Sequence, residues 1–180
     1  PRGVDGAGDA AWSGIGPLRS CSRFGPRPVA AGELRELLEC ARWAPSAENS
    51  QIARHVVVEG REAVGALWSA AFPDAPPPRA AELPSLAMLE LGAPFPIRAR
   101  TREQPFFLID VPIALTNVLV AAADLGLGWQ VAFRFDHARA AAHLDVPGDH
   151  QVVALVGLGE AADASPDASP SPLDQLRPAG

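Results

Sequence analysis

Arg42-Trp-Ala-Pro-Ser-Ala-Glu-Asn-Ser-Gln51 joins a predicted amphipathic helix to a predicted strand. Over residues 33–44, leucine and alanine recur at helical spacing while charged residues occupy the opposite face. Pro45 ends this helix because proline disfavours the helical conformation of the residue before it. The β-branched run 56–58 predicts a strand over 54–59. A short polar loop between a helix and a buried strand can hold a planar polar ligand, and a helix cap followed by a turn explains the same residues.

Periodicity and capping residues predict most of the remaining elements. These are helix 61–71, helix 110–125, strand 129–133, a helix from Asp136 to Leu144 with Asp136 as its cap, and strand 151–158. We expect Asp110 to cap helix 110–125, and Gly126 and Gly128 to end it. Because this helix is apolar on nearly all faces, we expect it to be buried on most sides and to suit the core of a dimer.

Prolines break almost every periodic pattern in residues 72–104, where a short helix near 82–91 is the only element suggested. The chain of 180 residues is 48% hydrophobic, which predicts a single globular domain, placed at 17–160. A glycine-rich flexible segment, 1–16, precedes it. An extended tail rich in alanine, serine, proline and aspartate, 161–180, follows it and cannot form a core.

Composition excludes several classes of function. The net charge of −6 and the pI of about 5.1 argue against nucleic-acid binding, which uses basic faces. The longest apolar run, 111–127, contains polar residues and is too polar to span a bilayer, and no signal peptide is visible. We therefore expect a cytoplasmic protein. All 15 basic residues are arginine, which indicates a GC-rich, bacterial genome and leaves arginine to fill any role that lysine usually has.

Two other site types find no support in the residues. The two cysteines and four histidines lack the spacing of metal ligands, so we expect no metal site and a structural role for His55 and His137. Gly157-Leu-Gly-Glu-Ala-Ala162 follows a strand and fits the dinucleotide pattern G-x-G-x-x-A, but no helix follows it. We therefore exclude a Rossmann site.

Three segments, in order, resemble motifs of the FMN-dependent nitroreductase family. Arg19-Ser-Cys-Ser-Arg-Phe-Gly-Pro-Arg-Pro-Val29 is similar to the family's R-R-S-x-R-x-F opening with its trailing P-V. Ala44-Pro-Ser-Ala-Glu-Asn-Ser-Gln51 is similar to A-P-S-x-x-N-x-Q. Residues 107–128, the pair Phe135-Asp136 and strand 152–159 resemble the central helix with its L-G-L-G turn, the G-F-D loop and the last core strand. Together these segments cover about two thirds of the chain.

The resemblance implies an α+β fold in which helices flank a central mixed or antiparallel sheet. It also implies an interlocked homodimer with FMN at the interface. It assigns the FMN phosphate to arginine and serine donors, which suit a phosphate, namely Arg19, Ser20, Ser22 and Arg23. It assigns polar and packing contacts of the flavin to Asn49 and Gln51, and to Pro45 and Ser46 of the partner chain. A backbone N–H of Phe133 or Arg134 would donate to flavin N5, and Arg177 is what remains of a basic pair near the C-terminus.

The chain also departs from the family pattern. Leu18 stands where the family has its first arginine, and Ser22 where it has the second basic residue; a slip of one residue would restore Arg19 and Arg23. Ile52-Ala-Arg54 follows Gln51 in place of the usual Pro-Trp. These differences suggest a divergent member with an altered substrate pocket.

Phe133 and Arg134 stand where the family has glycines, so they add bulk and a positive charge at this position. A guanidinium at Arg134 would stabilise an anionic reduced flavin, or else Arg134 turns outward and covers the surface.

The resemblance implies hydride transfer from NAD(P)H, through FMN, to a small nitro, quinone or related acceptor. Two alternatives remain open. One is oxidation of a bound peptide-like substrate with O₂ as acceptor, as in the cyclodipeptide oxidases and azoline dehydrogenases that resemble this family. The other is a non-catalytic assembly subunit with a degenerate flavin site, which works with a second subunit.

Overall fold

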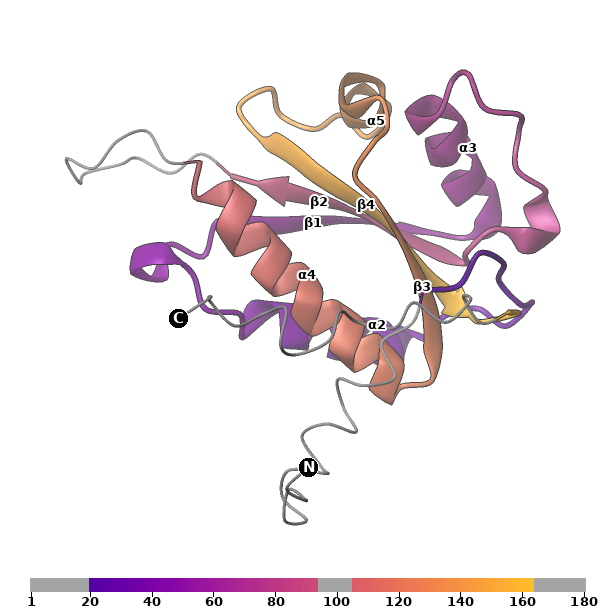
Figure 1. The fold of residues 1–180 in the computed structure, drawn as a ribbon, viewed down its shortest axis with the longest axis horizontal. Helices are drawn as coiled ribbons and strands as arrows, with labels where there is room; N and C mark the ends of the chain where they lie inside the picture. Colours follow the sequence, from indigo (N-terminus) through magenta and orange to yellow (C-terminus); the bar gives the residue numbers. More distant parts are fainter. Residues whose placement is uncertain (1–19, 94–104, 164–180) are drawn as a thin grey trace, which may run out of the picture.

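A computed structural model describes residues 20–93 and 105–163 of the chain. Its centre is a sheet of four antiparallel strands in the order β1-β2-β4-β3 (Figure 1). The strands are β1 (Ala53–Glu59), β2 (Leu86–Gly92), β3 (Leu127–Ala132) and β4 (Gln151–Glu160). The strands predicted over 54–59, 129–133 and 151–158 are confirmed within a few residues, and so is the α+β fold class.

Helices cover both faces of the sheet (Figure 1). The pair α2 (Ala31–Arg42) and α4 (Phe107–Asp124) lies on one face, and the pair α3 (Arg61–Ala71) and α5 (His137–His143) on the other. Two 3₁₀ turns, η1 (Ala47–Asn49) and η2 (Ala80–Glu82), complete the described part of the chain. Each face of the sheet carries its own apolar core, because alternate residues of a strand point to opposite faces.

The short helix suggested near 82–91 is wrong, because residue 82 ends η2 and residues 86–92 form strand β2. Every residue from Leu86 to Gly92 is buried, because β2 lies between β1 and β4 and beneath helices on both faces. A strand buried on both faces shows no alternation of apolar and polar residues. The pattern that would have identified a half-buried strand is therefore absent from this segment.

Helix α4 begins three residues earlier than expected, so Asp110 is not its cap. Asp110 lies inside the first turn, is almost fully buried, and accepts hydrogen bonds from another part of the chain. The predicted end is correct at Gly126, whose φ of +68° suits glycine, whereas Gly128 belongs to β3. Asp136 caps α5 as predicted, with its side chain accepting from the N–H of Arg139 at 2.9 Å.

Helix α4 is long and apolar enough to cross a membrane by length and composition alone. In the structure it lies across the sheet and contributes Leu115, Val118 and Ala122 to the core that it shares with α2. We therefore regard it as the central helix of a globular fold. Its first turn is less covered than the prediction implies, because Leu108 and Ile109 remain 54% and 50% exposed.

Candidate functional site

The N-terminal loop, residues 20–25, runs beside the ends of β3 and β4. Cys21 donates its N–H to the carbonyl of Trp129 at 2.9 Å, and Gly25 donates to the carbonyl of Glu160 at 2.7 Å. The buried Phe24 anchors the loop between these contacts. Ser22 and Arg23 are consequently turned towards solvent, where their side chains and their backbone N–H groups are available to an anion.

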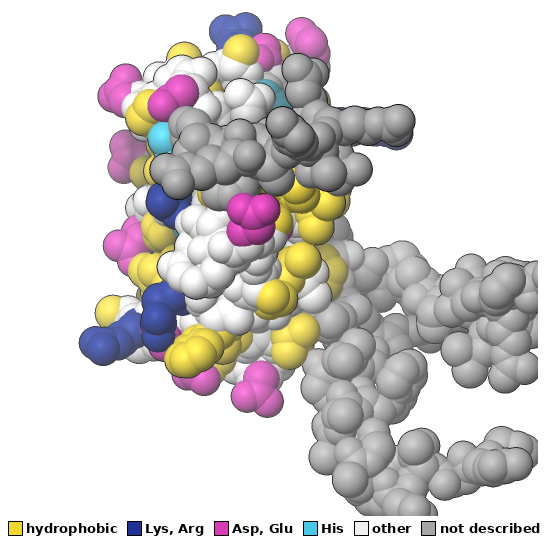
Figure 2. Space-filling model, turned by 90° about the vertical axis from the view of Figure 1, so that its left-hand side faces the viewer, with side chains coloured by type: hydrophobic (Ala, Val, Ile, Leu, Met, Phe, Trp, Pro, Cys, Tyr) yellow, Lys and Arg dark blue, Asp and Glu magenta, His cyan; other side chains and the backbone are white. Residues whose placement is uncertain are grey.

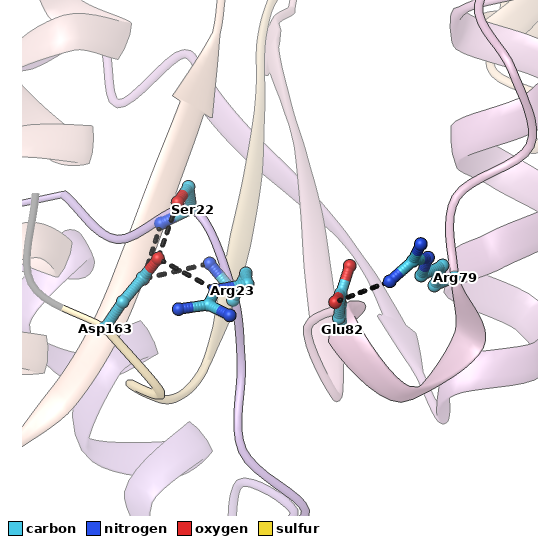
Figure 3. A network of polar contacts seen from close by, with 5 residues as sticks. All are labelled: Ser22, Arg23, Arg79, Glu82 and Asp163. Atoms are coloured by element: carbon cyan, nitrogen blue, oxygen red, sulfur yellow. Dashed lines mark hydrogen bonds and ion pairs between the residues drawn. The ribbon is translucent and has the colours of Figure 1, made fainter.

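An aspartate of the chain itself occupies that position (Figure 3). The carboxylate of Asp163 accepts from the N–H and Oγ of Ser22 at 3.0 and 2.7 Å, and from the N–H and Nε of Arg23 at 3.0 and 3.2 Å. The Ser22 hydroxyl and the Arg23 N–H hold the pKa of Asp163 well below its usual range, because they stabilise the charged form. Four donors that converge on one carboxylate form an anion site. All four belong to Ser22 and Arg23, which the family resemblance assigns to the FMN phosphate.

The far end of β3 carries Phe133 and Arg134. Both side chains are exposed, with Phe133 at 58%. Contacts on either side fix the turn: Nε2 of His137 lies 3.2 Å from the Phe133 carbonyl oxygen, and Asp136 donates its N–H to the carbonyl of Ala71 at 2.8 Å. Within the described residues the N–H groups of Phe133 and Arg134 donate no hydrogen bond. They are therefore free to donate to a ligand.

Arg134 forms no ion pair with any described carboxylate. Whether its charge acts on a flavin stays a prediction. Ser20, the first residue of the N-terminal loop, forms a bridge to Trp129 of β3, so it lies beside the strand that the Phe133 turn follows. Arg19 and Arg177, the other residues assigned to the phosphate end, lie outside the described residues.

The junction loop, residues 44–51, has an unusual backbone. Glu48, Asn49 and Gln51 all have φ between 50° and 55°, a region that residues other than glycine rarely adopt. Such strain persists only where surrounding contacts enforce it, and it is concentrated at functional sites. The contacts here are the Gln51 N–H to Ser46 Oγ at 2.9 Å and the Gln51 Nε2 to Asn49 Oδ1 at 3.1 Å.

Asp110 of α4 supplies the remaining support for the junction loop. Its two carboxylate oxygens accept from the N–H of Ala47 at 3.1 and 3.2 Å, and one of them accepts from Oγ of Ser50 at 3.2 Å. The sequence predicts a helix cap at this position and misses the contact, because the partners are separated by about sixty residues and no local pattern reports it. Asp163 was missed for the same reason, since it belongs to a tail without periodicity.

The predicted site residues thus form two groups at opposite edges of the sheet. Ser20, Ser22, Arg23, Phe133 and Arg134 lie along β3, whereas Pro45, Ser46, Asn49 and Gln51 precede β1. With three strand spacings between β1 and β3, the two edges are separated by about 14 Å. One chain does not bring the two groups together.

The family model that matches this sequence is that of the nitroreductase family, over residues 19–160. The structure is similar to a nitroreductase family protein from Clostridium novyi NT, with a TM-score of 0.73 and 22% identity over 84% of this chain and 85% of that chain. It is also similar to an FMN-dependent nitroreductase from Clostridium difficile R20291, with a TM-score of 0.74 and 20% identity over 92% and 98% of the two chains. For NfrA1 of B. megaterium the TM-score is 0.81, with 17% identity over 94% and 74%.

No curated protein sequence matches the chain. At these identities the solved structures establish the fold. The family model extends from the N-terminal loop through the junction loop and α4 to the end of β4, so it includes the elements that carry both groups of site residues. The chain therefore belongs to the nitroreductase family.

Proposed function

We propose that this protein is an FMN-dependent oxidoreductase that transfers hydride between NAD(P)H and a small organic acceptor such as a nitro compound or a quinone. Family membership supports oxidoreductase chemistry with a flavin, and one protein of similar fold is described as an FMN-dependent nitroreductase. The observation that carries the proposal is the arrangement along β3. A four-donor anion site lies at one end of this strand, and two free backbone N–H groups lie at the other.

The residues present fit FMN at both ends. The Asp163 carboxylate shows that the N-terminal loop accepts an oxyanion, so the same donors suit a phosphate once Asp163 is displaced. Arg19 and Ser20 would add to this cluster. The N-terminal loop lies beside Trp129, and the free N–H groups directly follow Ala132, so a single strand carries both sets of donors.

Each group of residues then has a defined task. The N-terminal loop binds and orients the phosphate, and the N–H of Phe133 or Arg134 donates to flavin N5. When bound, the flavin supplies the hydride chemistry. Asn49 and Gln51 supply amide groups for hydrogen bonds to the cofactor. Pro45 and Ser46 pack against its ring from a second copy of the chain.

A homodimer is part of this proposal, because one chain keeps its two groups of site residues about 14 Å apart. Hydrophobic side chains are exposed on the side of the molecule that carries η1 and the start of α4 (Figure 2). Leu108, Ile109 and Trp43 are at least half exposed although they are large and apolar. Burying them in a dimer interface would remove this apolar surface from water, which favours association. We place this dimer in the cytoplasm, without a membrane or nucleic-acid partner.

The visible spectrum of the purified protein tests the proposal. We expect a flavin band after reconstitution with FMN, extraction of FMN and not FAD, and anaerobic bleaching by NADH or NADPH. Sedimentation should give twice the chain mass, and Ile109→Glu should shift it towards the monomer. A flavin that is reduced by a substrate and reoxidised by O₂, but not bleached by either nicotinamide, would instead favour the oxidase alternative.

One contact favours the assembly-subunit alternative, because Asp163 fills the only anion site found in the described N-terminal loop. That alternative predicts a protein that stays colourless with excess FMN even after Asp163 is replaced. Binding of FMN by the Asp163→Asn variant would contradict it. Failure of both proteins to bind FMN would contradict the enzyme proposal.

A further inference from the structure

A cavity of about 240 Å³ lies between α2, the junction loop, β1 and the first turns of α4. Its walls are mostly apolar, with Leu38, Ala41 and Ala114 among them. Ala53 lines it at the position where the family motif has tryptophan, so the small side chain leaves room for a ligand. Mostly apolar walls with a few convergent polar groups are typical of small-molecule sites.

Arg54 lines this cavity with a charge that no described carboxylate compensates. Its Nη1 donates to the carbonyls of Gln51 and Ala53 at 2.6 and 2.8 Å, so the guanidinium is held in place by neutral groups. Nε and Nη2 form no hydrogen bond within the described residues. Arg42 also lines the cavity, but its guanidinium pairs with Glu39 at 2.5 Å. Arg54 is therefore the cation that remains available to an anion.

His55 lines the same cavity and is backed by a buried acid. Its Nδ1 lies 2.6 Å from Oε2 of Glu90, its cross-strand partner on β2. Glu90 is 0% exposed, and its other oxygen, Oε1, has no hydrogen-bond partner. Because Nδ1 faces Glu90, Nε2 is the ring nitrogen of His55 that is left for a ligand.

We propose that this cavity binds a small organic carboxylate with an apolar body, held by Arg54 and by Nε2 of His55. Arg54 donates to the ligand carboxylate through its free nitrogens, and His55 donates through Nε2. The other charged groups facing the cavity are Asp110 on α4 and Arg42 on α2; Asp110 already accepts from Ala47 and Ser50.

Calorimetric titration with cyclohexanecarboxylate tests this site, with the neutral cyclohexanecarboxamide as control. The saturated ring does not stack on a planar flavin, so binding over FMN is disfavoured. We expect saturable binding of the acid and weaker binding of the amide, because only the acid carries the charge that Arg54 pairs with.

Two variants locate the site. Arg54→Gln should weaken binding about ten- to a hundredfold, the usual effect of losing a charge-assisted hydrogen bond. Arg35→Gln, on the exposed face of α2, is the matched control and should leave the affinity unchanged. His55→Phe alone would strand the Glu90 carboxylate, so the double variant His55→Phe/Glu90→Leu is used. It should weaken binding of the acid, because the Nε2 contact is lost, while the protein stays folded.

Three results would overturn the proposal. They are the absence of saturable binding by the native protein, equal affinity for the acid and the amide, and an affinity that Arg54→Gln leaves unchanged. Pro45, Ser46 and Gln51 also line this cavity and are assigned to the flavin, so the affinity for FMN is measured on each variant as well. Arg54→Gln should weaken binding of the acid and leave FMN binding unchanged. This inference can therefore fail while the proposed flavin enzyme stands, and the reverse also holds.

Discussion

The N-terminal loop and the junction loop are both assigned to the same cofactor, but their polar groups are in opposite states. In the N-terminal loop, donors of Ser22 and Arg23 converge on a single acceptor, Asp163. In the junction loop, Asn49 and Gln51 bond to each other, and the loop borders a cavity. The donors of the N-terminal loop form an anion site that a carboxylate occupies. The polar groups of the junction loop instead bond within the loop and hold one side of the cavity in place.

This contrast indicates what each loop requires in order to bind a ligand. Backbone N–H groups that converge on one point attract any oxyanion, and here a carboxylate about 140 residues further along the chain fills the site. A strained loop needs support from its own fold before it can contact a ligand. The N-terminal loop should therefore respond to changes in charge, and the junction loop to changes in packing and buried hydrogen bonds.

The largest effect should come from Asp110→Ala, which removes the support of the junction loop. Asp110 is buried and accepts from the Ala47 N–H and the Ser50 hydroxyl, and hydrogen bonds to a charged group contribute about 1.5–3 kcal/mol each. We expect the free energy of unfolding in urea to fall by about 2–3 kcal/mol. Asp124→Ala, at the exposed end of the same helix, is the control. Equal stability of the two variants would contradict the role given to Asp110.

The next largest effect concerns FMN affinity and Arg23. If the N-terminal loop holds the phosphate, Arg23→Ala should weaken FMN binding about tenfold, measured by quenching of flavin fluorescence. Arg79→Ala provides a matched control, because Arg79 is also an exposed arginine but pairs with Glu82 at 3.7 Å, away from Asp163 (Figure 3). An equal loss of affinity in both variants would indicate general electrostatics and not a phosphate site.

A smaller change of opposite sign is expected for Asp163→Asn. Removing the competing charge should strengthen FMN binding roughly fivefold, the scale of an exposed ion pair. The pKa of Asp163 is lower in the folded protein than in the unfolded chain. The stabilising contact is therefore fully present above the pKa of the unfolded chain, and it is lost only as the pH falls through the pKa of the folded protein. Between pH 5 and 8 the carboxylate stays charged, and the gain should not vary across that range. A gain that disappears at pH 5 would contradict this assignment.

These contacts also show which parts of the molecule are predictable from sequence. The helices, three of the four strands and the Asp136 cap follow from local periodicity and capping residues. Strand β2 does not, because burial on both faces removes the alternation that identifies a strand. The family motifs predict which residues belong to the site. Asp110, Asp163 and the His55–Glu90 pair were missed because each acts across a long separation in sequence.

The smallest predicted effect concerns the thiol behind the N-terminal loop. Burial, and to a lesser extent the nearby charge of Asp163, raise the pKa of Cys21 from 9.0 to about 11. The thiolate is the reactive form, so iodoacetamide at pH 8 should modify Cys21 much more slowly than the half-buried Cys40, as peptide mass mapping would show. Asp163→Asn should lower the Cys21 pKa slightly and speed its modification by a modest factor, since burial remains. If the variant instead makes Cys21 as reactive as Cys40, the Asp163 contact holds the N-terminal loop against β3, and its loss exposes the thiol. That outcome would give Asp163 a structural role beyond competition with a phosphate.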